Sequence, residues 1–136
     1  MREILFRGKT RDNEWVQGLL WLKRPNSSRD IFISFYDDHN DSEDAVRVLE
    51  TTVSEFTGLT DKNGVKIFEG DIVKVKYTGE NKGLEGIGKV VFKDCKFALV
   101  WGWHKEIVCL TDFCNVTFEV IGNIHDNPEL LGGANV

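Results

Sequence analysis

Residues 61–77 read DKNGVKIFEGDIVKVKY, and this stretch decides the fold. It opens with DKNG (61–64), whose residue types tolerate or require a positive φ and therefore predict a tight reverse turn. It closes with alternating side chains, in which Val73, Val75 and Tyr77 share one face and lysines occupy the other. An apolar residue at every second position is typical of a β-strand with one buried face. The stretch therefore predicts a turn that leads into a strand of a β protein.

Further short apolar runs, rich in Val, Ile, Phe and Trp, lie on both sides of this stretch. The expected strands are residues 4–6, 14–22, 31–36, 71–77, 87–92, 97–103, 107–110 and 117–121. The five in the second half are too few for a stable open sheet with bare edges, and they suit a small closed or half-closed barrel. GDIVKV, a loop, GKVVF, a turn and an aromatic strand are similar to the opening strands of SH3-like barrels. We therefore predict a mainly β fold, with an N-terminal β-meander over residues 1–56 packed with a C-terminal SH3-like small β-barrel over residues 57–136.

Four segments carry more local predictions. Residues 37–44, DDHNDSED, hold five acids and predict a solvated loop. Residues 45–53 fit either a short helix or a strand, and the β-branched side chains at 51–53 favour the extended form. Residues 127–132, NPELLG, combine an N-cap Asn, a Pro at the first helical position and a terminal Gly, so they predict a single helical turn. Both faces of the 14–22 strand are apolar, so we expect both to be covered.

Three stretches of the chain resemble the YopX family of phage and prophage proteins. They are ILFRGK (4–9), TVSEFTGLTDKNGVKIFEGDIV (52–73) and EVIGNIH (119–125), the last followed by NPELL (127–131). The central run is close to the family pattern T-V-x-x-[YF]-T-G-L-x-D-x-N-G-x-x-I-[YF]-E-G-D-I-[VI]. The chain departs from the family in two details, with Gly8 where Ala is usual and Ser54 where Gly is usual. The resemblance implies a β-rich protein with an SH3-like part, encoded by a bacteriophage or prophage, and it implies no established activity.

The residues of the central run have a structural interpretation. Gly58, Gly64 and Gly70 are spaced to serve turns and close approaches of the backbone. Asp61 and Asn63 have side chains that bond to the backbone within a turn. We therefore predict that this motif directs folding rather than binding, and that Gly64 has a positive φ.

Composition excludes several classes of protein. The chain has 136 residues, with 17 basic and 22 acidic side chains and a net charge of −5. These figures argue against disorder, a coiled coil and a strongly basic nucleic-acid binder. No apolar run approaches the roughly 18 residues of a membrane span, and the N-terminus lacks a signal-peptide core. Three cysteines, an odd number, fit reduced thiols. We therefore expect a cytosolic protein that has no contact with membranes, and the resemblance to the YopX family implies that the cytoplasm is that of a bacterial host.

No constellation of residues predicts catalysis, a cofactor or a metal. DKNG (61–64) begins like a calcium loop, but the glycine comes too early and Ile72 stands where a bidentate Glu is needed. The acids Asp37, Asp38, Asp41 and Glu43 favour solvation over ion binding. The zinc candidates His104, Cys109 and Cys114 lack the short ligand spacing of zinc sites, so buried thiols are the simpler interpretation. No nucleophile elbow or phosphate loop is present, and Gly83, Gly86 and Gly88 predict a hairpin loop.

Aromatic side chains supply the candidate binding site. Trp101, Trp103 and His104 can form a stacking platform for a partner, or their strand can belong to the core; Trp15 and Trp21 present the same choice. We expect a non-catalytic protein that acts by binding another protein, of phage or host. The alternative is a nucleic-acid-binding module with a lysine face of Lys74, Lys76, Lys82, Lys89, Lys93 and Lys96. Residues 57–136 contain no arginine, the better reader of phosphates and base edges, so nucleic acid is disfavoured.

Overall fold

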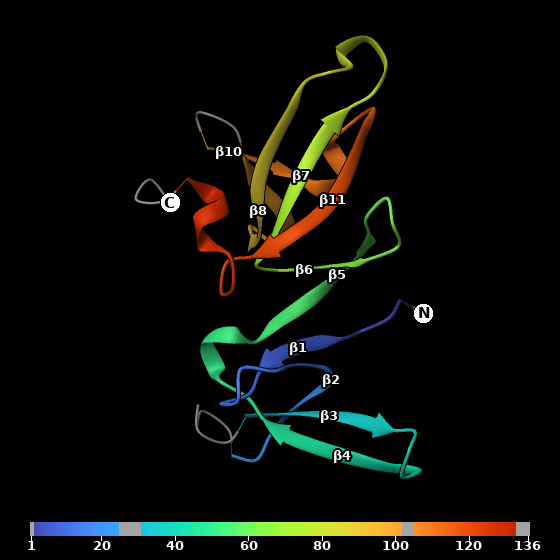
Figure 1. Ribbon diagram of the computed structural model, residues 1–136, viewed down its shortest axis with the longest axis vertical. Helices are drawn as coiled ribbons and strands as arrows, with labels where there is room; N and C mark the ends of the chain where they lie inside the picture. The colour runs from blue at the N-terminus through green and yellow to red at the C-terminus, as the bar shows by residue number, and fades with distance from the viewer. Residues whose placement is uncertain (1, 25–30, 102–104, 133–136) are drawn as a thin grey trace. The chain divides into compact units, whose positions relative to one another are not determined.

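The computed structural model describes residues 2–24, 31–101 and 105–132, and over these ranges the chain is mainly β with antiparallel strand pairs. The chain divides into two compact units, Met1–Phe56 and Thr57–Val136 (Figure 1). In the described ranges the helical segments are short 3-10 turns, and none is long and apolar enough to cross a membrane.

The first unit is an antiparallel sheet with the strand order β4-β3-β2-β1-β5. Its strands are β1 (Phe6–Lys9), β2 (Trp15–Leu22), β3 (Ile31–Asp37), β4 (Ser42–Arg47) and the first residues of β5 (Ser54–Thr60), which is preceded by the 3-10 turn η2 (Glu50–Thr52). Ile31, Ile33 and Val48 form the buried core. A Cβ at Gly8 would lie 2.9 Å from the Cβ of Val48, so the glycine leaves the space that Val48 fills.

Half of the acidic segment 37–44 is strand, and the predicted loop is wrong in its bounds. Asp37 ends β3 and Ser42 begins β4, so the turn between them is only residues 38–41. The Asp37 carboxylate accepts hydrogen bonds from the backbone N–H of His39 (2.9 Å) and from Nδ2 of Asn40 (2.7 Å). Such a bond to the backbone two residues on tightens a turn, which allows the acids at 42–44 to continue as a strand with exposed side chains.

Three other predictions in the first unit have mixed outcomes. The first strand begins at Phe6, later than predicted. Residues 45–53 divide between the two alternatives, since β4 runs to Arg47 and η2 follows. The expectation that both faces of β2 are covered is wrong, because Leu19 is 58% and Trp21 50% exposed. An antiparallel sheet needs only one covered face, and here that face carries Val16 and Leu20.

The second unit is built on a five-stranded antiparallel sheet with the order β10-β9-β8-β7-β11. Its elements are β6 (Lys66–Phe68), β7 (Asp71–Tyr77), η3 (Gly79–Asn81), β8 (Glu85–Lys93), β9 (Lys96–Trp101), β10 (Glu106–Cys109), η4 (Leu110–Asp112), β11 (Val116–Asn123) and η5 (Pro128–Leu131). In Figure 1 β7 lies between β8 and β11. Among the described residues β10 and β11 remain the edges of this sheet, so a closed barrel is not confirmed.

Alternation along β7 creates the core of the second unit, as its sequence predicts. Val73 and Val75 are fully buried, together with Val90 of β8 and Leu99 of β9. Tyr77 shares their face and packs on this core, whereas Lys76 is exposed. Leu110 of η4 and Ile67 of β6 complete the cluster. Segments 71–77 and 96–101 are therefore strands of one sheet, which confirms that part of the prediction.

Asp61 joins the reverse turn to the last strand of the sheet. Its side chain is buried, with 7% exposed. Oδ1 accepts hydrogen bonds from the backbone N–H groups of Asn63 (2.8 Å) and Val65 (2.9 Å), and Oδ2 accepts one from Val120 of β11 (2.9 Å). Next to it, the Lys62 N–H donates to the carbonyl of Phe118 at 2.9 Å. The sequence predicts the local bonds of Asp61, and the structure adds the long-range one.

The glycines of the central motif have the backbone conformations that the motif requires. Gly64 has φ +79°, which confirms the prediction, and Gly58 and Gly70 are also in the left-handed region. The Gly70 N–H donates to the Val90 carbonyl (2.8 Å), and the Gly70 carbonyl accepts from the Ile124 N–H (2.9 Å). The buried carboxylate of Asp71 accepts the Phe68 N–H at 2.7 Å. The motif thus ties β6, β7, β8 and the end of β11 together.

The C-terminal helical turn is confirmed as η5, and Gly132 after it has φ +91°. Asn127 stands at its N-cap position but makes no side-chain bond to the turn. Its Oδ1 accepts instead from the backbone N–H of Asn123 at 3.3 Å, and its side chain lies where a Cβ of Gly122 would be. A single turn leaves few N–H groups to cap, so the side chain serves the end of β11.

Candidate functional site

Trp101 lies at the end of β9, within a cluster of four aromatic rings. Its ring centroid is 6.0 Å from that of Tyr77 and 5.3 Å from that of Phe113, and Phe113 lies 5.5 Å from Phe118. These spacings are those of favourable aromatic pairs. All four rings pack against the core of the second unit, and Trp101 is half-buried. Trp101 therefore belongs only in part to the core, because part of it packs there and part remains open.

Two glycines of β8 seat the indole of Trp101. Gly88 is the cross-strand neighbour of Trp101, and a Cβ on it would lie 2.5 Å from the Trp101 Cβ. A Cβ on Gly86 would lie 2.9 Å from two carbons of the six-membered ring. The interpretation of Gly83, Gly86 and Gly88 as one hairpin loop is thus wrong for the last two, which are strand residues. A glycine inside a strand often marks a close approach of another group, and this signal was available in the sequence.

A hollow of about 630 Å³, called here the aromatic hollow, opens beside this cluster. Its lining includes Tyr77, Thr78, Gly79, Glu80, Asn81, Trp101, Glu106, Val108, Asp112, Phe113, Cys114 and Asn115. Three of these residues are acidic, and no side-chain hydrogen bond or ion pair of theirs with a described residue is recorded. Aromatic faces next to free carboxylates attract a cationic side chain.

The indole N–H of Trp101 is enclosed and has no acceptor among the described residues. An enclosed donor without a partner destabilises the folded chain by about 1–3 kcal/mol. Such a group is rare in protein interiors and calls for an explanation.

Of the three residues of the predicted platform, the structure describes only Trp101. Trp103 and His104 lie outside the described residues, and Trp101 is joined by residues that the sequence analysis missed, namely Tyr77, Phe113, Glu106 and Asp112. Alternation in β7 pointed to Tyr77, but nothing in the sequence connected residues 106–113 with β7.

In the first unit Trp21 is half-exposed and lies 5.1 Å from Phe32, and the guanidinium of Arg7 lies 4.8 Å above the Trp15 ring.

The cysteines do not have the surroundings that we expected. Cys95 and Cys114 are exposed and Cys109 is half-buried, so the interpretation as buried thiols is wrong. A hydrogen bond with Thr111, at 3.3 Å from Sγ to Oγ1, lowers the pKa of Cys109. Over residues 2–24, 31–101 and 105–132, no three His, Cys, Asp or Glu side chains gather as a metal site would require.

The lysines of the second unit gather on the outer face of the sheet, opposite Val73 and Val75. Strand register places five of them on this face, namely Lys74, Lys76, Lys89, Lys93 and Lys96. Two carboxylates interrupt the face, since Glu119 is the cross-strand neighbour of Lys74 and Glu85 that of Lys76. Lys62 forms an ion pair with Glu119 at 3.0 Å. The lysine face therefore exists, with acids placed within it.

Comparison with solved structures finds the same fold elsewhere. The crystal structure of protein EF1440 from Enterococcus faecalis matches with a TM-score of 0.58 and 24% identity, covering 96% of this chain and 99% of that one. The X-ray structure of protein yopX from Bacillus subtilis matches with a TM-score of 0.64 and 19% identity, covering 96% and 98%. At these identities the likeness shows the fold alone. The search of curated proteins finds no match.

A family model described as YopX protein matches residues 5–132. This range contains the Asp61 turn, the Gly70–Asp71 junction and the whole aromatic cluster. It confirms the resemblance drawn from the three sequence stretches. The chain belongs to the YopX family.

Proposed function

We propose that this chain is a non-catalytic accessory protein of a phage or prophage, that it acts in the host cytoplasm, and that it does so by binding another protein. The aromatic hollow is the binding site, and the occupant is a basic side chain on an exposed segment of the partner. The observation that carries this proposal is that one hollow brings the rings of Trp101, Tyr77 and Phe113 together with three carboxylates that have no partner among the described residues.

The charges and rings of the hollow favour a lysine or arginine over an apolar side chain. A cation above an aromatic face gains roughly 0.5–2 kcal/mol, more as it is desolvated. Glu80, Glu106 and Asp112 add attraction, and over the described ranges of the chain they have no partner that they would first have to leave. If the sheet is taken as an SH3-like half-barrel, an aromatic-lined peptide groove is also the recognition mode that such folds use.

Capture from infected host cells tests this proposal. The bait is compared with Glu106→Gln/Asp112→Asn, which removes two charges from the hollow, and with Asp12→Asn/Glu14→Gln, which removes two exposed charges from the first unit. We expect one protein to be retained by the wild type and by the control and to be lost with the hollow variant. The same protein in purified form should bind the wild type and the control with similar affinity and the hollow variant more weakly. Equal retention by all three baits would contradict the hollow as the site.

Nucleic acid is the second candidate, and the common face of the five lysines favours it. Glu85 and Glu119 within that face, and the net charge of −5, oppose it. A nuclease-treated arm of the same capture separates the two functions, because retention through nucleic acid is lost there. Such binding would also weaken by about 0.9 log units per tenfold rise in salt for each phosphate contacted.

A further inference from the structure

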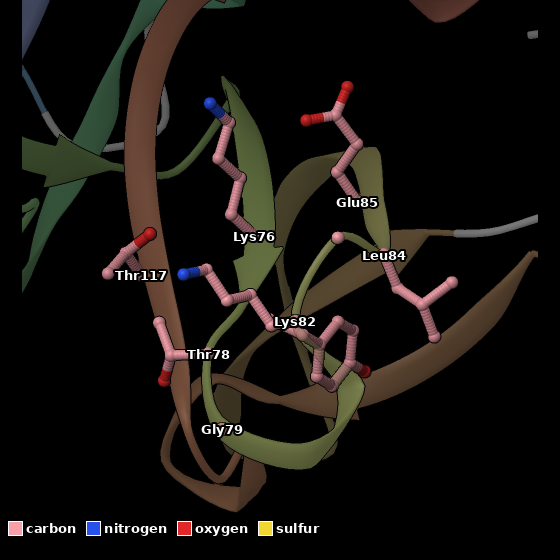
Figure 2. A pocket seen from close by; sticks show the side chains of 9 residues that line it. Lys76, Thr78, Gly79, Lys82, Leu84, Glu85 and Thr117 are labelled. Atoms are coloured by element: carbon pink, nitrogen blue, oxygen red, sulfur yellow. The ribbon is translucent and has the colours of Figure 1, made fainter.

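A second hollow in the second unit, of about 550 Å³, is lined by basic and hydroxyl side chains (Figure 2). It shares Tyr77, Thr78 and Gly79 with the aromatic hollow and is called here the lysine hollow. Its further lining residues are Lys76, Lys82, Gly83, Leu84, Glu85 and Thr117. None of these is part of the site that we assign to the protein partner.

Separate elements bring the two lysines to this hollow. Lys76 lies on β7, and Lys82 lies in the loop between η3 and β8. That loop is held in place by backbone hydrogen bonds from Lys82 N–H to the Gly79 carbonyl (3.1 Å) and from Tyr77 N–H to the Leu84 carbonyl (3.0 Å). Figure 2 shows the Lys82 ammonium group directed to the side on which Thr78 and Thr117 lie, whereas the Lys76 ammonium group extends to the top of the view, level with the carboxylate of Glu85.

The two lysines of this hollow outnumber its one carboxylate, that of Glu85. Neither Lys76 nor Lys82 has a recorded ion pair. Glu119, two residues along β11 from Thr117, is already engaged by Lys62 at 3.0 Å. The hydrogen bond and charge of Lys62, followed by the charges of Lys74 and Lys76, hold the pKa of Glu119 below its ordinary value. Of the two lysines of the hollow, Lys76 therefore also acts on Glu119 of β11 through its charge.

We propose that the lysine hollow binds the phosphate group of a phosphate monoester. Two ammonium groups match the two negative charges of a monoester, and the hydroxyls of Thr78 and Thr117 supply further donors to its oxygens. A single carboxylate carries one negative charge, so it matches only one of the two ammonium groups. Lysine binds phosphate as a point charge and suits a tetrahedral group.

The carboxylate of Glu85 limits the affinity of the lysine hollow for phosphate, so removing its charge tests the proposal. It lines the hollow and is the cross-strand neighbour of Lys76, so its carboxylate repels an incoming anion. Replacing it with Gln removes this repulsion and leaves the two ammonium groups in place. Glu85→Gln should therefore bind phosphate several-fold more tightly than the wild type, by about threefold or more.

The experiment is an NMR titration of the full chain with inorganic phosphate at constant ionic strength and about pH 8, where phosphate carries close to two charges. We expect saturable shifts of the Lys76, Thr78 and Lys82 amides, with a dissociation constant of about 1 mM. Lys76→Gln/Lys82→Gln should weaken binding about tenfold or more. Lys93→Gln/Lys96→Gln is the matched control, because it removes two exposed lysines of the same sheet that do not line the hollow, and it should leave binding unchanged.

Two further probes define the ligand class. Dimethyl phosphate, a monoanion like the phosphodiester of a nucleic acid, and acetate should each bind at least about tenfold more weakly than phosphate. Either probe binding as tightly as phosphate would overturn the assignment to a monoester. So would shifts that do not saturate, or equal losses in the two lysine variants. Because no residue changed here removes an aromatic ring or an acid of the aromatic hollow, failure of this proposal leaves the proposed partner site intact.

Discussion

The carboxylate of Asp61 accepts the backbone N–H of Val120, 59 residues further along the chain, at 2.9 Å. The same side chain closes its own turn through the N–H groups of Asn63 and Val65. One buried carboxylate therefore fixes both the reverse turn and the position of β11 against it. This relationship explains why the central motif of the family carries Asp at this position.

Replacing Asp61 should destabilise the fold strongly. Asp61→Ala leaves three backbone N–H groups without their acceptor and should lower the free energy of unfolding by about 3 kcal/mol. Asp61→Asn keeps one acceptor oxygen and should cost less, about 1–2 kcal/mol. Urea unfolding measures both, with Asp38→Ala in the exposed 38–41 turn as the control. A loss below about 0.5 kcal/mol for Asp61→Ala would contradict the role assigned to this carboxylate.

Asp61 should also make the fold sensitive to acid. Burial alone would raise its pKa, but the N–H groups of Val120, Val65 and Asn63 and the charge of Lys62 outweigh it and hold the pKa below the ordinary value of 3.8. A pKa that is lower in the folded chain gives stability that is present above 3.8 and is lost as the pH falls through that value and below. Asp61→Asn has no carboxyl to titrate there. The stability difference between wild type and Asp61→Asn should therefore shrink between about pH 5 and about pH 2, as urea unfolding across that range would show.

Substitutions at Gly64 should lower the free energy of unfolding only by the amount that each side chain costs at a positive φ. No atom lies within 4 Å of a Cβ built on it, so the penalty comes from the backbone and not from a clash. Gly64→Asn should cost less than Gly64→Ala, whose penalty is about 1 kcal/mol, and Gly64→Val should cost most because its side chain is branched at Cβ. Melting temperatures rank the three variants. A Val variant as stable as the Asn variant would contradict the left-handed turn.

The glycines under Trp101 should differ in how well they accept a methyl group. A Cβ at Gly88 meets the Trp101 Cβ at 2.5 Å and the Val100 carbonyl oxygen at 2.6 Å, and neither atom can move without the strand. A Cβ at Gly86 meets only the ring. Gly88→Ala should destabilise the fold by about 2–3 kcal/mol, and Gly86→Ala by less with a displaced indole. Chemical unfolding measures the loss of stability, and the NMR signal of the Trp101 indole N–H reports a displaced ring. An unchanged signal in Gly86→Ala would contradict the close contact between Gly86 and the ring.

The parts of this fold that follow from the sequence are those that depend on neighbours along the chain. Alternation in β7 fixed which of its side chains are buried, and the residue types of the 61–64 turn fixed the φ of Gly64. Which faces of β2 are buried could not be predicted from the sequence. An apolar strand face shows that the face can be buried, but it does not show whether another element packs against it. Closure of the sheet also depends on the pairing of distant strands, and no local signal encodes that pairing.

The candidate site shows the same division. Trp101 stands out in the sequence as an aromatic residue on an alternating strand. The acids that line its hollow come from residues 80, 106 and 112, which are brought together only by the β8–β9–β10 and β7–β11 pairings. Gly86 and Gly88 carried a usable signal, since glycine within a strand often marks a close contact. That signal could locate the place on β8, but it could not identify the ring that lies there.

We propose that the family motif builds the fold, whereas the aromatic hollow binds the partner. The most direct test measures partner affinity and melting temperature together for Glu106→Gln/Asp112→Asn and for Gly64→Val. We predict that the first variant keeps its melting temperature and loses affinity about tenfold or more, and that the second melts earlier but binds normally where it is folded. The opposite pattern, in which Gly64→Val is fully stable yet loses the partner while the hollow variant binds normally, would contradict the account.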